Sequence, residues 1–193
     1  MAMFVPMTAG VEVNGETVLS IVAGLGTFKS MALTLLKKHG IDNPKAGAWY
    51  SQQAWLDAFK EISGSLGGST LFNIGQKIPE SAVFPPQIND IQKALGAIDV
   101  AFHMNHRMKG KALFNPENGM MSEGIGHYTF KSTGPTEARM VCKNSYPCDF
   151  DRGIIEGMAR KFKPAGSHVL VQHDESAPCR KKGADSCEYI VRW

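Results

Sequence analysis

The strongest constraint on the fold is a change in hydrophobic period near residue 124. Before this point, apolar residues recur every three to four positions, which predicts helices. After it, residues 125–131 and 137–143 alternate as strands do, 149–163 return to a helical pattern, and 168–173 and 187–193 again resemble strands. This order predicts an α+β fold, in which N-terminal helices precede a β-β-α-β-β unit with a small antiparallel sheet. We expect residues 1–193 to form a single domain.

The first hundred residues contain three long helical patterns and one short one. The first covers 16–39, with breaks at Gly24 and Gly26, and the second begins after Ser51, a typical N-cap residue. A short helix over 69–77 is predicted to end before Pro79. The third long helix runs to about residue 107, and its apolar stripe consists of Ile88, Ile91, Leu95, Ile98 and Phe102. The segment 109–124 has no period and is rich in Gly, Asn, Pro and Met, so we expect a long loop that covers a cavity.

Composition and charge exclude several classes of protein. Apolar residues make up 43% of the 193 residues and charged residues 20%, as in an ordinary globular domain. Lys and Arg number 21 against 18 Asp and Glu, and this net charge of +3 is too small to predict nucleic-acid binding. No window of 18 apolar residues predicts a membrane span, and no basic segment opens a signal peptide. We therefore expect a cytoplasmic protein, whose cysteines are thiols or metal ligands.

Three of the four cysteines have spacings that a metal site uses. Cys148 opens a predicted helix, and Cys179 and Cys187 flank the turn C-R-K-K-G-A-D-S-C. Zn²⁺ prefers thiolates gathered from separate elements, and a helix N-terminus stabilises a thiolate. The fourth position is open to water or to His173, Asp174 or Glu175. Cys142 lies in a predicted strand and fits a buried thiol.

The C-terminal part, residues 148–193, resembles the C-terminal half of the 4-vinyl reductase domain. The shared features are a cysteine that opens a helix, Gly153 and Gly157 four residues apart on it, and the C-x-x-x-G-x-x-x-C turn before a closing strand. In phenol-sensing transcription activators of this family, the three cysteines and a Glu hold a structural zinc. The resemblance therefore implies a zinc site of Cys148, Cys179, Cys187 and Glu175, although the family's Glu position holds Ser176 here.

The same resemblance implies a ligand between the helices and the sheet. The family is similar in fold to haem-nitric-oxide/oxygen sensor domains and to TRAPP subunits, which implies that the fold encloses a small hydrophobic molecule. Ten Met and ten Phe suit an adaptable apolar pocket. We expect an apolar or aromatic ligand between the third long helix and the inner face of the first strand of the unit, with Ile98, Phe102, His106, Tyr128 and Phe130 as its contacts.

Two alternatives stay open beside a sensory, ligand-binding domain. A haem gas sensor needs a proximal His on a helix, which His103 or His106 offers, but the propionate-binding motif Tyr-x-Ser-x-Arg is absent. A reductase or tetrapyrrole-handling enzyme needs titratable groups in the pocket, and His103, His106 and His127 are the candidates. No G-x-S-x-G, P-loop, dinucleotide fingerprint or H-E-x-x-H motif occurs. Family members often pair through N-terminal helices, so the resemblance also implies a homodimer.

Overall fold

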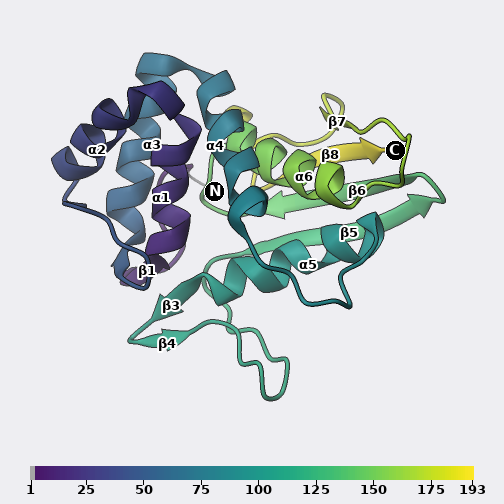
Figure 1. The fold of residues 1–193 in the computed structure, drawn as a ribbon, viewed down its shortest axis with the longest axis horizontal. Coiled ribbons are helices and arrows are strands. Elements are labelled where there is room, and N and C mark those ends of the chain that lie inside the picture. The colour runs from purple at the N-terminus through teal and green to yellow at the C-terminus, as the bar shows by residue number, and fades with distance from the viewer. Residues whose placement is uncertain (1–2) are drawn as a thin grey trace.

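The computed structural model describes residues 3–193 and shows a helical half beside a half built on a sheet (Figure 1). The helical half contains α1 (Gly15–Gly24), α2 (Lys29–Lys38) and α3 (Gln52–Leu66). In the other half, α5 (Ile91–Met104) and α6 (Cys148–Phe162) lie along the larger sheet. Between the halves stands α4 (Gly68–Ser81), which packs on both α1 and α6. The predicted α+β class, with helices first, is confirmed.

The larger sheet has the predicted four antiparallel strands. Its order is β5-β6-β8-β7, and the strands are β5 (His127–Gly134), β6 (Glu137–Lys143), β7 (Leu170–His173) and β8 (Cys187–Arg192). Alternate residues of β6 and β8 are buried on the face that α5 and α6 cover, as period-two sequences require. On the opposite face, Arg139 forms ion pairs with Asp174 and Glu188. The sheet therefore has one apolar face, which forms a wall of the core.

A second antiparallel sheet was not predicted. Its order is β2-β1-β3-β4, and the strands are β1 (Val11–Asn14), β2 (Trp49–Ser51), β3 (His106–Met108) and β4 (Lys111–Ala112). Strands of two to four residues are too short to show a hydrophobic period. The third long helix consequently ends at Met104, not near residue 107, and His106 begins a strand.

The other helix boundaries follow local signals, with one exception. Ser51 caps α3 as predicted, because its hydroxyl accepts a hydrogen bond from the backbone N–H of Ala54. The exception is α4, which continues through Pro79 to Ser81 instead of ending near residue 77. Its last turn is held from outside, since the Lys161 ammonium on α6 donates to the carbonyls of Pro79 and Ala82. Tertiary contacts thus hold the last turn of α4 in place, although Pro79 cannot donate a backbone hydrogen bond within the helix.

Helices α4 and α6 meet at backbone contact. A Cβ atom on Gly153 would lie 2.1 Å from the carbonyl oxygen of Phe72, and one on Gly75 would lie 2.3 Å from that of Phe150. Gly157 faces Pro79 and Gln76 in the same contact. Gly153 and Gly157 therefore allow α6 to cross close to α4, and this contact joins the two halves.

Helices α1 and α2 belong to the core of the helical half. No single helix among residues 3–193 is long and apolar enough to cross a membrane. The pair Gly15–Gly24 and Gly26–Lys38, bent by 114°, passes a test of length and composition when taken together. Within this pair, Val18, Ile21 and Leu36 are completely buried in the protein core.

Candidate functional site

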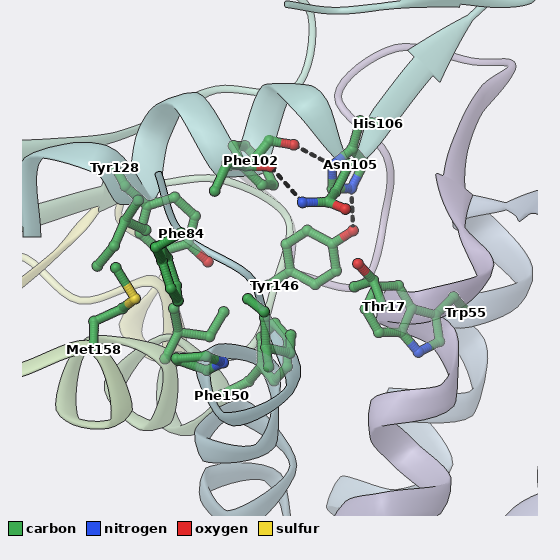
Figure 2. Close-up of a pocket in the computed structure, with 16 residues that line it drawn as sticks. Thr17, Trp55, Phe84, Phe102, Asn105, His106, Tyr128, Tyr146, Phe150 and Met158 are labelled. Carbon is green, nitrogen blue, oxygen red and sulfur yellow. Dashed lines mark hydrogen bonds between the residues drawn. The ribbon is translucent and has the colours of Figure 1, made fainter. Parts of the chain in front are cut away.

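An apolar cavity lies where α3, α5, α6 and the end of α4 converge (Figure 2). Its volume is about 90 Å³. Aromatic rings from several helices, from β5 and from the connecting segments surround it, and several touch edge to face, such as Phe102 with Tyr128 and Trp55 with Tyr146. The main lining residues are Trp55, Phe84, Ile98, Phe102, Tyr128, Tyr146, Phe150 and Met158.

His106 is the titratable side chain at the end of α5 that faces this cavity. Its Nδ1 lies 2.7 Å from the carbonyl oxygen of Phe102, and its Nε2 lies 2.6 Å from the hydroxyl of Tyr146. The Nδ1–H donates to the carbonyl, so Nε2 accepts from the Tyr146 hydroxyl, which itself accepts from the Gln52 amide at 3.1 Å. Burial lowers the pKa of His106 to about 4, so the imidazole is neutral at physiological pH.

The structure brings four of the five predicted ligand residues together at this cavity. Ile98, Phe102, His106 and Tyr128 line it. Phe130 shares the inner face of β5 with Tyr128 but packs over Gly96 of α5, outside the cavity lining. Its role as a ligand contact stays a prediction.

The cavity differs from the prediction in the segment that covers it and in several of the residues that line it. Within the described residues 3–193, none from 109–124 lines the cavity, so the prediction that this loop covers it is wrong. Ala82 and Phe84, from the segment between α4 and α5, take that place. Sequence reasoning missed most of the lining, including Thr17, Trp55 and Tyr146, because these residues reach the cavity only through long-range packing.

A long groove adjoins the cavity on the side of Phe84. It has a volume of about 1,120 Å³ and runs between α1, the segment after α4, and α5. Cavity and groove share six lining residues: Thr17, Ile78, Ala82, Phe84, Ala101 and Asn105. The Phe84 ring is held against Phe162, with ring centroids 5.2 Å apart, and by the Lys161 ammonium 4.7 Å from its centroid. Displacement of Phe84 would therefore join the two spaces.

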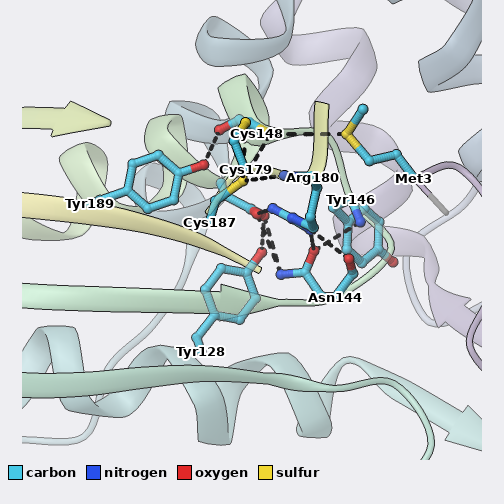
Figure 3. A network of polar contacts seen from close by, with 10 residues as sticks. Met3, Tyr128, Asn144, Tyr146, Cys148, Cys179, Arg180, Cys187 and Tyr189 are labelled. Carbon is cyan, nitrogen blue, oxygen red and sulfur yellow. Dashed lines mark hydrogen bonds and ion pairs between the residues drawn. The ribbon is translucent and has the colours of Figure 1, made fainter. Parts of the chain in front are cut away.

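Three cysteines and one histidine form a cluster at the N-terminal end of α6. Figure 3 shows the cysteines. Cys148, His173, Cys179 and Cys187 each bring one ligand atom within 4.8 Å of the others. The sulfur of Cys187 lies 3.1 Å from that of Cys148 and 3.9 Å from that of Cys179. A tetrahedral Zn²⁺ with Zn–S bonds of about 2.3 Å sets sulfurs about 3.8 Å apart. The three predicted cysteines are thus gathered at the spacing of a metal site.

The polar surroundings of this cluster favour a metal ion. The Nε2 of His173 is buried and has no hydrogen-bond partner among the described residues. The Cys148 thiol, the His173 side chain and the backbone N–H of Arg180 stabilise the Cys187 thiolate and hold the pKa of Cys187 well below its usual range. Glu175 is not within this group and lines the surface depression beside it. The structure therefore places His173, and not Glu175, beside the three cysteines, while Glu175 as a metal ligand stays a prediction of the resemblance.

A buried ion pair connects the cysteine cluster to the cavity. Arg180, whose backbone N–H contacts the Cys187 sulfur, pairs through its guanidinium with Asp151. The Tyr128 hydroxyl, at the cavity wall, donates to the other oxygen of Asp151 at 2.5 Å. Both charged side chains are fully buried, and desolvation raises the pKa of Asp151 to about 6. Figure 3 shows this path from the sulfurs through Arg180 to Tyr128.

Comparison with known proteins identifies the fold. No protein-family model matches the chain, and no curated protein matches its sequence. Solved H-NOX (haem-nitric-oxide/oxygen) structures match it over 93% of its length. An H-NOX protein from S. oneidensis in the Fe(II)NO state has a TM-score of 0.63 at 15% identity, with 98% of that chain covered. A mutant Fe(II) unliganded H-NOX protein from K. algicida has a TM-score of 0.62 at 12% identity, with 95% covered.

These likenesses establish a shared fold. An H-NOX domain from Shewanella oneidensis in the Fe(II)CO state, 16% identical over 97% of its own chain, has a TM-score of 0.61. The predicted relation in fold to haem-nitric-oxide/oxygen domains is thereby confirmed. The closer resemblance to the 4-vinyl reductase domain is matched by no family model.

Proposed function

We propose that residues 1–193 act as one sensory domain, which binds a small apolar or aromatic molecule in the cavity at His106. The observation that carries this proposal is a mainly apolar, aromatic-lined cavity with a neutral, hydrogen-bonded pair, His106 and Tyr146, in its wall. Binding sites for small molecules have this composition. An engineered apolar cavity of about 150 Å³ in another protein binds benzene. The cavity of about 90 Å³ is closer to that scale than to the scale of a large cofactor.

The polar pair sets the chemistry of the expected ligand. His106 Nε2 accepts one hydrogen bond, and the Tyr146 hydroxyl donates one and accepts another. A ligand hydroxyl inserted between them would receive and return these hydrogen bonds, so that neither buried group loses its partner. We therefore expect an apolar body with a single polar atom. A larger ligand of this kind would displace Phe84 and extend into the groove.

We further propose a structural Zn²⁺ on Cys148, Cys179 and Cys187, with His173 as the fourth ligand. The sulfur spacing and the unpartnered His173 Nε2 support it. The ion would join the first turn of α6 to β7, β8 and the connection between them. With four protein ligands such a site is closed and stabilises the fold. Pairing of two copies through the helical half stays a prediction of the family resemblance.

Haem is the second candidate, and the structural comparisons support it better than they support an apolar ligand, because each named neighbour is an H-NOX protein. His106 also has a suitable orientation, with Nδ1 fixed by a carbonyl and Nε2 facing the cavity. The surrounding residues do not fit the group. The Tyr146 hydroxyl stands 2.6 Å from Nε2, where a bound iron would lie at about 2 Å.

The volume of the cavity and the charge of its lining also do not fit haem. Sites for drug-sized molecules measure about 300 Å³ or more, several times this cavity. The cavity lining contains no Lys or Arg to pair with propionates. In the adjoining groove, Lys77 is paired with Glu80 and Lys93 with Asp90. Haem would require the His106–Tyr146 hydrogen bond to break and Phe84 to move.

The two candidates are separated by binding measurements on the purified chain. Thermal unfolding is recorded with phenol, indole and benzene as probes, and absorption spectra are recorded after addition of haemin. Ala101→Phe fills the cavity, whereas Ala97→Phe, one turn earlier, enters only the groove and serves as the matched control. We expect a probe to raise the melting temperature of the wild type and of Ala97→Phe but not of Ala101→Phe. A haem absorption band that His106→Gln abolishes would instead establish haem binding, and no response to any probe would contradict the proposal.

A further inference from the structure

A second group of metal-ligating side chains joins α5 to β5 outside the cavity. Asp99 and His103 lie one turn apart on α5, and His127 opens β5. One ligand atom from each of the three lies within 4.8 Å of the others. The imidazole rings of His103 and His127 face each other, with centroids 5.0 Å apart and planes tilted by 34°. Two imidazoles and a carboxylate are therefore gathered at a single point.

His103 has a nitrogen that no protein group satisfies. Its side chain is completely buried, and Nδ1 donates to the backbone carbonyl of Asp99 at 2.8 Å. Its Nε2 is buried and has no hydrogen-bond partner among residues 3–193. A buried polar group without a partner destabilises the folded protein. Because Nδ1 carries the donated proton, Nε2 can offer its lone pair to a metal ion, a common role of imidazole.

The carboxylate of Asp99 organises the rest of the group. Its Oδ1 accepts the backbone N–H of Tyr128 at 2.8 Å, and its Oδ2 lies 2.9 Å from Nδ1 of His127. On the other side of the His127 ring, Nε2 lies 3.3 Å from the carboxylate of Glu123, whose side chain is 83% exposed. His127 is thus oriented by carboxylates from two different segments.

We propose that Asp99, His103 and His127 form a Zn²⁺ site separate from the cysteine cluster. Zinc accepts two imidazoles and one carboxylate with bonds of about 2.0–2.2 Å, which leaves a fourth position for water. Bonds of this length set ligand atoms about 3.4 Å apart, so Asp99 Oδ2 and His127 Nδ1, now 2.9 Å apart, must separate slightly, while any pair near the 4.8 Å limit must approach. His127 is partly exposed and can adjust, because its other contact, Glu123, is an exposed side chain, while His103 and Asp99 are fixed by α5.

An ion at this point would stiffen the wall of the cavity. It would tie the last turns of α5 to the first residue of β5. Phe102 precedes His103 and Tyr128 follows His127, and both of these neighbours line the cavity. A bound zinc ion would therefore restrict the positions of Phe102 and Tyr128, the two rings that a ligand would contact.

The number of bound zinc ions tests this site independently of the cysteine cluster. Metal-free protein is titrated with Zn²⁺ by calorimetry, and the bound ions are counted after dialysis. His127→Gln removes a ligand of the proposed site, and Cys179→Ser removes one of the cluster. His39→Gln is the matched control, because His39 also contacts a carboxylate, that of Glu61, at 2.7 Å but belongs to neither group.

After dialysis, we expect the wild type and His39→Gln to retain one zinc ion more than His127→Gln. In the titration, the affinity of His127→Gln for this ion should be lower by more than about 10-fold. Titration with Co²⁺ assigns the ion, since the thiolate charge-transfer band of the cluster should survive in His127→Gln. Equal numbers and affinities of zinc in the wild type and His127→Gln would overturn the proposal. Asp99→Asn, which keeps an oxygen for the Tyr128 N–H, decides the result if His127→Gln does not fold.

Discussion

The Nε2 of His106 lies 2.6 Å from the hydroxyl of Tyr146, 40 residues further along the chain. This hydrogen bond joins the segment after α5 to the segment before α6 at the wall of the cavity. Gln52, from the first turn of α3, donates to the same hydroxyl at 3.1 Å. One buried oxygen therefore holds three segments from both halves of the molecule.

The burial of His106 predicts a specific loss of stability in acid. Its pKa is lowered from 6.5 to about 4 in the folded protein. Between these pH values the unfolded chain binds the extra proton, so the stabilisation is complete above pH 6.5 and is lost as pH falls toward 4. We expect the wild type to lose about 2–3 kcal/mol more than His106→Gln between pH 7.5 and 4.5.

Urea unfolding of both proteins at the two pH values measures this difference. Asp151, whose raised pKa of about 6 favours the folded state in acid, is present in both proteins and cancels in the comparison. Parallel pH profiles for the two proteins would show that His106 is not buried as described.

The cysteine cluster predicts which side chain completes the zinc site. Cys179→Ser should lower zinc content and melting temperature together, whereas Cys142→Ala, in the strand position opposite Cys187, should keep the zinc. His173→Ala should weaken zinc binding by about 10-fold or more, and Glu175→Ala should leave it unchanged. Zinc analysis by mass spectrometry after dialysis against a chelator checks all four. A larger effect of Glu175→Ala would restore the ligand set that the family resemblance implies.

The α4–α6 crossing predicts opposite effects for two Gly→Ala substitutions. In Gly153→Ala the new methyl group would meet the carbonyl oxygen of Phe72 at 2.1 Å, so we expect a loss of about 3 kcal/mol or more. Gly64→Ala, in α3, faces open space and should gain up to about 1 kcal/mol from helix propensity. Chemical denaturation measures both. Equal free energies of unfolding for Gly153→Ala and Gly64→Ala would mean that α4 and α6 cross farther apart than described.

The buried ion pair predicts a strong asymmetry between its partners. Arg180→Met leaves Asp151 buried without its charged partner and should cost about 3–5 kcal/mol. Addition of Asp151→Asn to this variant should recover part of the loss, because the unpaired charge is removed. Lys77→Met, which breaks an exposed pair with Glu80, should cost less than about 1 kcal/mol. Urea unfolding compares the three, and similar losses for Arg180→Met and Lys77→Met would contradict the buried network.

The local sequence determined those helices and strands that are specified by neighbouring residues, such as a cap residue or an alternation of side chains. Ser51 predicted the start of α3, and alternation along 137–143 predicted β6, because capping and side-chain period depend on near neighbours. The approach of Cys148 to Cys179 and Cys187 was also predicted, since each cysteine flanks an element that the pattern identified. Strands of two to four residues, such as β3, carry no period and were missed.

Only the tertiary structure decided the rest. Pro79 remains within α4 because Lys161, 82 residues away, binds its carbonyl. Trp55 lines the cavity because α3 and α6 are brought together by the glycine contact of α4. His173 joins the cysteines, and His103 meets His127, through strand register and helix packing. Sequence alone therefore determined which groups were available for chemistry, whereas long-range packing, which no local pattern encodes, decided which of them meet.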